Sequence, residues 1–228
     1  MTSDKLSRIL RNIPLFHIFT DLLEFGINKM YNGNYDINGK KEDGIMYYGT
    51  KVKLRAYKKE DIPLAYDFVN DGELKKLLVT DVPFPTMYEE EEQWYESLLK
   101  DKDNYNFAIE DLETGNYIGG CGINKLDWLN RVATIGIMIG DKRYWGKGYG
   151  TDAVKVLNKF IFQQMNMNKI KLNVFSFNER AKKSYDKCGF QIEGILRQEL
   201  FRDGEYYDEY VMALLLEDWK RKVDNQEI

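Results

Sequence analysis

A basic, glycine-rich turn at residues 143–150, RYWGKGYG, constrains this chain more than any other segment. The apolar segment 132–139 before it predicts a strand, and the amphipathic segment 150–164 after it predicts a helix. The first N–H groups of a helix lack intrahelical acceptors, and the helix dipole favours an anion at that end. Glycines allow a close backbone approach, and Arg143 and Lys147 supply positive charge. The turn therefore predicts a phosphate-binding site, although a turn that only reverses the chain could share its glycines.

Two other phosphate loops do not match this turn. A Walker A loop fails because Gly140 lies one residue too far from Gly146, and because Lys147 precedes a glycine instead of Ser or Thr. A Rossmann turn needs GxGxxG and a later acidic residue, whereas the glycines here follow GxGxG and no such acidic residue ends a second parallel strand. The pattern that fits is Arg-x-x-Gly-x-Gly, from Arg143 to Gly148.

A second constellation follows in the segment 173–190, NVFSFNERAKKSYDKCGF. A helix over 178–187 would place Asn178, Ala181 and Tyr185 on one face, because offsets of three, four and seven residues return near the same angle. Gly189 is suited to ending this helix. An amide, a small gap and a phenol would then line one wall, although Asn178 could act only as an N-cap and Tyr185 only as a buried aromatic.

Together the two segments resemble the coenzyme A-binding motifs of the GNAT superfamily of N-acetyltransferases, and the resemblance spans roughly residues 51–219. The pattern is most similar to the branch that contains ribosomal-protein N-terminal acetyltransferases and spermidine acetyltransferases, including the hairpin at 204–208. The resemblance implies an α/β (α+β) acyl-CoA acyltransferase fold, with a mixed, mostly antiparallel central sheet and flanking helices. It also implies acetyl-CoA (coenzyme A) as the co-substrate.

The same resemblance implies which residues contact acetyl-CoA and which residue is catalytic. The strand at 132–139 would splay from its neighbour, so that free N–H groups at its end pair with the pantetheine arm and the acetyl carbonyl. Tyr185 would be the catalytic residue that protonates the departing thiolate. The implied cofactor-binding set is Ile137, Met138, Ile139, Arg143, Tyr144, Trp145, Gly146, Lys147, Gly148, Tyr149, Gly150, Thr151, Asn178, Ala181 and Tyr185.

Composition argues against several other classes of protein. A net charge of -4 lacks the basic face of a nucleic-acid-binding domain, and no apolar run is long enough for a membrane span. Because His17 is the only histidine, no metal site and no Cys–His nucleophile are expected, and direct transfer in a ternary complex is favoured. Because Cys121 and Cys188 are the only cysteines, a disulfide framework is not expected, and this favours a cytoplasmic location. Cys188 is expected to be an inert, packed thiol.

Three segments are expected along the chain. Residues 1–45 predict a helical extension and linker, residues 46–222 the acetyltransferase domain, and residues 223–228 a polar C-terminal tail. The apolar stripe from Phe16 to Ile27 is compatible with a homodimer contact, with partner docking or with packing onto its own domain. The expected strands are 51–56, 106–110, 117–124, 132–139, 169–174, 190–197 and 206–215, and the expected helices are 62–70 with Asp61 as N-cap, 88–99, 150–164 and 178–187.

The acceptor is less constrained than the donor. A primary amine of a small molecule or a peptide is expected, in a pocket built by the first two helices and the hairpin at Tyr206. The glutamates at 89–92 suit a polyamine or a basic N-terminus, yet glutamates that open a helix are typical of a solvated face. Glu199 and Tyr207 are candidates to border the acceptor cleft, with a water chain as the alternative general base. A non-catalytic acyl-CoA-binding or sensing module with the same fold is the alternative function.

Overall fold

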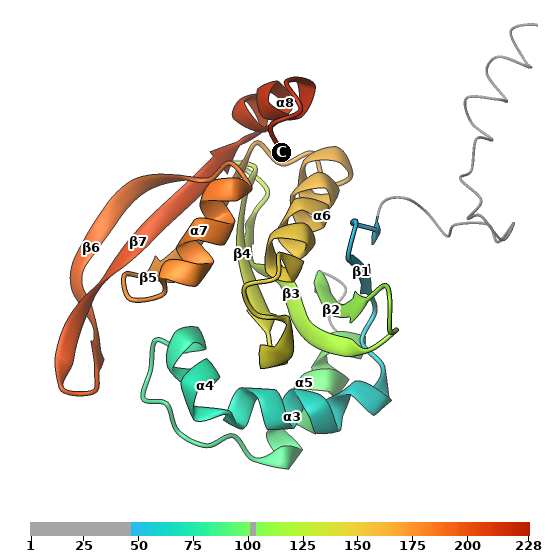
Figure 1. Ribbon diagram of the computed structural model, residues 1–228, viewed down its shortest axis with the longest axis vertical. Helices are drawn as coiled ribbons and strands as arrows, with labels where there is room; N and C mark the ends of the chain where they lie inside the picture. Colours follow the sequence, from blue (N-terminus) through green and yellow to red (C-terminus); the bar gives the residue numbers. More distant parts are fainter. Residues whose placement is uncertain (1–46, 101–103) are drawn as a thin grey trace, which may run out of the picture. The chain divides into compact units, whose positions relative to one another are not determined.

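The computed structural model describes residues 47–100 and 104–228 (Figure 1). The helical extension and linker predicted at 1–45 lie outside the described residues, and so does the apolar stripe considered for a homodimer contact. The described chain forms a seven-stranded sheet in the order β1-β2-β3-β4-β5-β7-β6, and only β4 and β5 run parallel. The mixed, mostly antiparallel sheet predicted from the sequence is thereby confirmed. The strands are β1 (Val52–Arg55), β2 (Asn106–Asp111), β3 (Tyr117–Asp127), β4 (Val132–Ile139), β5 (Lys169–Phe175), β6 (Gln191–Arg202) and β7 (Glu205–Leu215).

Helices flank this sheet, and the four that were predicted begin and end within a residue of their predicted bounds. They are η2 (Lys59–Asp61), α3 (Ile62–Asn70), α4 (Gly72–Leu78), α5 (Tyr88–Lys100), η3 (Lys142–Tyr144), α6 (Tyr149–Gln163), α7 (Glu179–Lys187) and α8 (Leu216–Asp224). Helices α4 and α8 were not predicted. A single extended residue, Asp71, separates α4 from α3, and its carboxylate caps α4 by accepting a hydrogen bond from Leu74 N. Helix α8 extends into the segment 223–228 that was expected as a polar tail.

One predicted helix cap differs from the structure. Asp61 lies at the N-cap of α3 and Pro63 lies in the first turn, as expected, but the Asp61 carboxylate makes no capping bond to this helix. It accepts hydrogen bonds from the Arg55 guanidinium at 2.7 and 2.9 Å and from Lys58 N at 2.8 Å. A charge-assisted hydrogen bond to Arg55 is stronger than a neutral capping bond, so the Asp61 carboxylate binds Arg55 at the end of β1 and does not cap α3.

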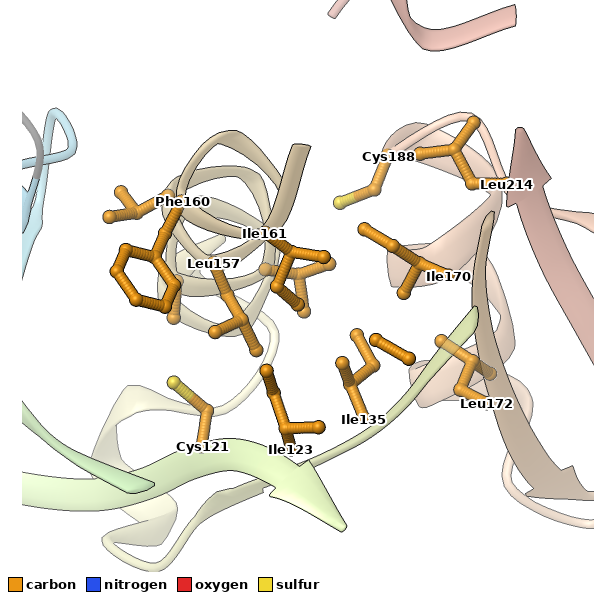
Figure 2. Close-up of a cluster of buried hydrophobic side chains, with 14 of the residues drawn as sticks. Cys121, Ile123, Ile135, Leu157, Phe160, Ile161, Ile170, Leu172, Cys188 and Leu214 are labelled. Atoms are coloured by element: carbon orange, nitrogen blue, oxygen red, sulfur yellow. The ribbon is translucent and has the colours of Figure 1, made fainter. Parts of the chain in front are cut away.

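The main core lies between α6 and one face of the sheet (Figure 2). Leu157 and Ile161 of α6 point toward Ile123 of β3, Ile135 of β4 and Ile170 of β5. All five side chains are buried, and burying one such side chain stabilises the fold by roughly 1.5–3 kcal/mol. Since strand side chains alternate between faces, the residues one position further along β3, β4 and β5 face the other side of the sheet.

Helix α3 packs on that opposite face through a second, smaller cluster. Ala65 of α3, Ala108 of β2 and Tyr117 of β3 are buried together, with Tyr57 and Phe68 against them. Trp94 of α5 meets the Tyr57 ring edge-on, with 4.9 Å between the ring centroids. The sheet is thus covered by α6 and α7 on one face and by α3 and α5 on the other.

The N-terminal end of α6 is joined to β1 by a buried carboxylate. Asp152, in the first turn of α6, accepts hydrogen bonds from Thr50 N, Thr50 Oγ1, Lys51 N and Val52 N at 2.7 to 3.1 Å. Buried carboxylates are stabilised by such hydrogen bonds, and a negative charge at this end also suits the helix dipole. This contact positions the start of α6, where the glycine-rich turn enters the helix.

Candidate active site

Strands β4 and β5 separate after a short stretch of pairing. Their paired residues are Val132 with Lys169, Ala133 with Ile170, and Thr134 with Lys171. Beyond Thr134 the edge of β4 has no β5 partner, and residues 135–139 line a cavity of about 830 Å³. An unpaired strand edge presents main-chain groups that an extended ligand can bind. Ile137, Met138 and Ile139 lie on this edge, where the resemblance placed the pantetheine arm.

The glycine-rich turn leads from this edge into α6. Gly146 and Gly148 have positive φ values of 71° and 88°, a conformation that favours glycine. A Cβ built at Gly146 would meet no atom within 4 Å, so the space beside the turn is open. Gly148 is the N-cap of α6, and the first N–H groups of the helix follow it at the cavity. This open cradle at a helix N-terminus fits a pyrophosphate group.

Three residues of the implied cofactor set do not line this cavity. Arg143 is 80% exposed and its guanidinium binds Asp141, which raises the pKa of Arg143. The Tyr149 ring packs edge-on against Tyr144 and carries the Lys51 ammonium over its face. Lys147 is exposed at the rim of the turn. The other members line the cavity, namely Ile137, Met138, Ile139, Tyr144, Trp145, Gly146, Gly148, Gly150, Thr151, Asn178, Ala181 and Tyr185.

Trp145 attaches the turn to β4 and carries a cation that the sequence did not indicate. Its indole Nε1 donates a hydrogen bond to Ile139 O at 2.6 Å. The Arg180 guanidinium lies 3.4 Å from the centroid of the Trp145 ring, a cation–π contact, and Arg180 lines the cavity. Desolvation lowers the pKa of Arg180, although the side chain remains charged at neutral pH. Arg180 therefore brings positive charge to the cavity wall, where Arg143 does not.

Helix α7 brings Asn178, Ala181 and Tyr185 to the same cavity. Asn178 is the N-cap, and its side chain accepts a hydrogen bond from Ala181 N at 3.2 Å. Gly189, with a φ of 91°, follows the helix end as expected. The Tyr185 side chain is 7% exposed, and its hydroxyl has no hydrogen-bond partner among the described residues. Burial raises the pKa of Tyr185, so the phenol keeps its proton at neutral pH.

The cavity continues to the opposite face of the sheet, where the floor is made of glycines. Each of these glycines leaves room for a polar side chain that a Cβ would displace: Gly120 faces the Tyr57 hydroxyl, Gly122 faces the Asn106 amide, and Gly136 faces the Asn124 amide. All six residues except Tyr57 belong to β2, β3 or β4, and all six line the cavity. The gap between β4 and β5 thus connects a donor-side region under α7 with a polar region on the other face.

The walls of this polar region differ in part from the prediction. Helices α3 and α5, the first two predicted helices, line it through residues such as Val69 and Trp94, and the unpredicted α4 lines it through Leu74, Leu77 and Leu78. Glu91 of α5 also lines the cavity, and burial raises its pKa. The prediction that all four glutamates at 89–92 form a solvated face is therefore only partly right, because Glu91 lines the cavity.

The two candidates for the acceptor cleft, Glu199 and Tyr207, do not line the cavity among the described residues. The Tyr207 hydroxyl donates to Glu205, and its ring packs against Phe177. Glu199 falls in the irregular stretch of β6 between Leu196 and Leu200, where the β6–β7 register shifts. Glu209 of β7 lines the cavity in their place, and no local motif in the sequence marks it.

The cysteines of the described chain are not suited to nucleophilic catalysis. Burial raises the pKa of Cys188 to about 12, and its Sγ contacts Thr151 O at 3.4 Å. Burial also raises the pKa of Cys121 above its ordinary value. Within residues 47–100 and 104–228, no group of His, Cys, Asp and Glu side chains could hold a metal ion, and no helix is long and apolar enough to cross a membrane.

A mixed sheet that separates between β4 and β5, a glycine turn at a helix N-terminus and a buried phenol beside the same cavity are the features that the resemblance to acetyltransferases implied. The family model for the GNAT acetyltransferase domain matches residues 51–191, and the chain belongs to this family. It is an N-acetyltransferase by membership and by its relatives.

The relatives match most of the described domain. The chain is 30% identical to the uncharacterized N-acetyltransferase p20 of Bacillus licheniformis, over 75% of this chain and 97% of that protein. It is 27% identical to the spermidine N(1)-acetyltransferase of Vibrio cholerae, over 73% of this chain and 94% of that protein. The crystal structure of the Vibrio cholerae spermidine N-acetyltransferase in complex with CoA and spermine aligns with a TM-score of 0.67 and 27% identity, over 74% of this chain and 98% of that one.

Proposed function

We propose that this N-acetyltransferase uses acetyl-CoA as its donor and acetylates the primary amine of a small cationic molecule, such as a polyamine. The observation that carries the proposal is a single cavity that passes through the sheet at the β4–β5 gap. Donor-binding groups lie at one end of it, and amide and carboxylate side chains lie at the other. Spermidine N-acetyltransferases among the relatives support an amine of this class.

The donor end matches the chemistry of coenzyme A. The pyrophosphate would lie at the glycine turn and the first N–H groups of α6, with positive charge from Arg180, whose guanidinium packs on Trp145 of the turn. The unpaired edge of β4 would bind the pantetheine arm. Bound acetyl-CoA supplies an acetyl thioester, whose carbonyl needs hydrogen-bond donors as negative charge develops on it. Those N–H groups between Ile137 and Ile139 that point to the unpaired edge of β4 would serve that task, which is worth about 10²- to 10³-fold for one donor.

Proton transfer at the donor end falls to Tyr185. Its phenol is buried, protonated and without a hydrogen-bond partner in the described chain, so it can donate to the departing thiolate. No described cysteine is suited to carry the acetyl group, because Cys121 and Cys188 are buried and their pKa values are raised. We therefore propose direct transfer from the thioester to the amine in a ternary complex.

The acceptor end favours a cation. Glu91 and Glu209 are carboxylates that line the cavity, and the Tyr57 and Trp94 rings, which pack on each other, line it too. Ammonium groups bind both carboxylates and aromatic faces. A basic peptide N-terminus would present one such group, whereas a polyamine presents several along one chain.

A panel of amines tests the proposal by measuring thiol release from acetyl-CoA. Spermidine, spermine, simple alkyl amines and short peptides with free N-termini would be compared with their acetylated forms as controls. We expect thiol release with the polyamines and mass gain of one acetyl group on them. Thiol release with peptides alone would show that the acceptor is a peptide and not a polyamine. Binding of coenzyme A without thiol release for any amine would indicate the non-catalytic module.

A further inference from the structure

Glu209 is the one carboxylate of β7 that lines the cavity, and it is only 5% exposed. It lies opposite Phe175 in the β5–β7 ladder, so that Asn173, two residues earlier on β5, shares its face of the sheet. The Asn173 amide Nδ2 donates a hydrogen bond to Glu209 Oε2 at 3.1 Å. No described residue is bonded to Oε1, which leaves one carboxylate oxygen available to a ligand.

This pair stands on the acceptor side of the β4–β5 gap. On β5, Ile170, Leu172 and Val174 face the core under α6, so Asn173 faces the other way. Tyr185 approaches the same cavity from α7, on the donor side. Glu209 and Tyr185 thus line the same cavity from two different elements, β7 and α7.

We propose that Glu209 accepts the proton of the acceptor amine and that Asn173 is a positioning residue that holds the carboxylate toward the gap. In this step the amine nitrogen forms a bond to the acetyl carbonyl carbon and the carbon–sulfur bond breaks. The proton lost by the nitrogen goes to Glu209, and the thiolate takes a proton from Tyr185. The assignment rests on the proposed acetyl transfer to an amine and adds the base to it.

The surroundings of Glu209 favour this role. Burial raises the pKa of the carboxyl, the hydrogen bond from Asn173 lowers it, and the negative charge of Glu199 on β6 raises it. A base whose pKa is shifted toward neutral removes a proton more effectively than an ordinary carboxylate. Other residues that line the cavity are Leu74, Leu77 and Leu78 of α4, Phe175 of β5, and Arg180, Lys183 and Lys187 of α7.

The test is the pH dependence of kcat/KM for the best amine of the panel. The native enzyme should lose activity as the pH falls, because Glu209 becomes protonated. The substitution Glu209→Gln keeps the side-chain volume and an oxygen that can accept from Asn173. We expect it to lower kcat by about 10²-fold or more and to abolish the loss of activity that Glu209 causes at low pH. Affinity for coenzyme A should not change, which shows that the fold is intact.

Two neighbouring substitutions should shift the pH at which kcat/KM falls on the acidic side, here called the acidic limb, in opposite directions. Asn173→Ala removes a hydrogen bond that lowers the pKa of Glu209, so the limb should move to higher pH. Glu199→Gln removes a charge that raises this pKa, so the limb should move to lower pH while the plateau stays the same. A residue with a merely structural role would produce neither displacement.

The outcomes separate this inference from the proposed function. If the native enzyme acetylates no amine, the proposed function fails and the base has no reaction to serve. If the native enzyme is active and Glu209→Gln raises KM alone, with the acidic limb still present, Glu209 only binds the amine and the inference is overturned. Loss of kcat together with the acidic limb supports it.

Discussion

The two faces of the central sheet are built in different ways. Under α6 the face is closed by buried aliphatic side chains such as Leu157 and Ile161 (Figure 2). The opposite face carries amide, phenol and carboxylate groups above glycines, and the cavity keeps them accessible. The donor side is thus formed largely by main-chain groups at a strand edge and a helix end, whereas the acceptor side is formed by individual side chains. Main-chain groups on the donor side suit a donor that is always the same. Side chains on the acceptor side can be substituted to fit a particular amine.

The largest expected effect tests the one donor-side role that depends on a side chain. Tyr185→Phe removes the buried hydroxyl and keeps the ring against Phe190. We expect kcat to fall by about 10²- to 10⁴-fold, with the affinity for coenzyme A unchanged, because the departing thiolate loses its proton donor. Steady-state kinetics and calorimetric titration measure the two quantities. Tyr66→Phe on α3 is the matched control, and an unchanged rate in Tyr185→Phe would remove this residue from the mechanism.

A second substitution tests whether backbone shape controls the donor side. Gly146→Val places a branched side chain at a φ of 71°, which costs about 1–3 kcal/mol in strain and displaces the turn. Affinity for coenzyme A should fall by about 10- to 100-fold, since the N–H groups of the cradle move with the turn. Gly194→Val is the control, because Gly194 has no positive φ and no atom near its Cβ position. If the Gly146 variant binds coenzyme A normally, the pyrophosphate lies elsewhere.

A smaller effect is expected on the acceptor side. In Gly120→Ala the new Cβ would lie 1.9 Å from the Tyr57 hydroxyl, so the tyrosine must move. Overpacking of this kind costs about 1–3 kcal/mol, and we expect kcat/KM for the amine to fall about 10-fold with coenzyme A affinity unchanged. Gly72→Ala, which has open space around its Cβ, is the control. Equal losses for donor and acceptor would show that the two faces are not independent.

The smallest effect concerns the contact between the donor turn and α4. Lys142 binds Asp71 at 2.7 Å and Glu73 at 2.8 Å, and all three side chains are at least one-third exposed. Exposed ion pairs contribute little to stability, so Lys142→Gln should lower the free energy of unfolding only slightly. Chemical denaturation measures it, and the loss should disappear in high salt because the charges are then screened. A larger, salt-independent loss would mean that α4 depends on this contact for folding.

The donor side could be predicted from the sequence because its signals are local. The apolar segment 132–139 marks β4, the glycines mark the turn, and Asn178 and Gly189 mark the ends of α7. Helix α4 was missed because a single extended residue, Asp71, separates it from α3. Helix α8 was missed because its nine residues bury only Trp219.

The acceptor side could not be predicted in the same way, because its contacts join distant residues. Asn173 and Glu209 meet across the β5–β7 ladder although they lie 36 residues apart in the sequence. Register also matters, because the pairing of Phe175 with Glu209 sets the face of the sheet that Glu209 shares with Asn173. Such choices depend on strand pairing, which no short motif encodes.

The short pairing of β4 with β5 has a consequence for how the domain moves. Only three residue pairs join β4 to β5 in the described sheet, so β1–β4 and the strands β5, β7 and β6 form two parts with a short connection. Peptide groups on an unpaired edge exchange their hydrogens readily with solvent, and local opening begins where pairing is sparse. A ligand arm that lies along residues 135–139 takes the place of the missing ladder partner. With such a ligand the two parts of the sheet would be joined along this edge, and we expect residues 135–139 to exchange their amide hydrogens more slowly.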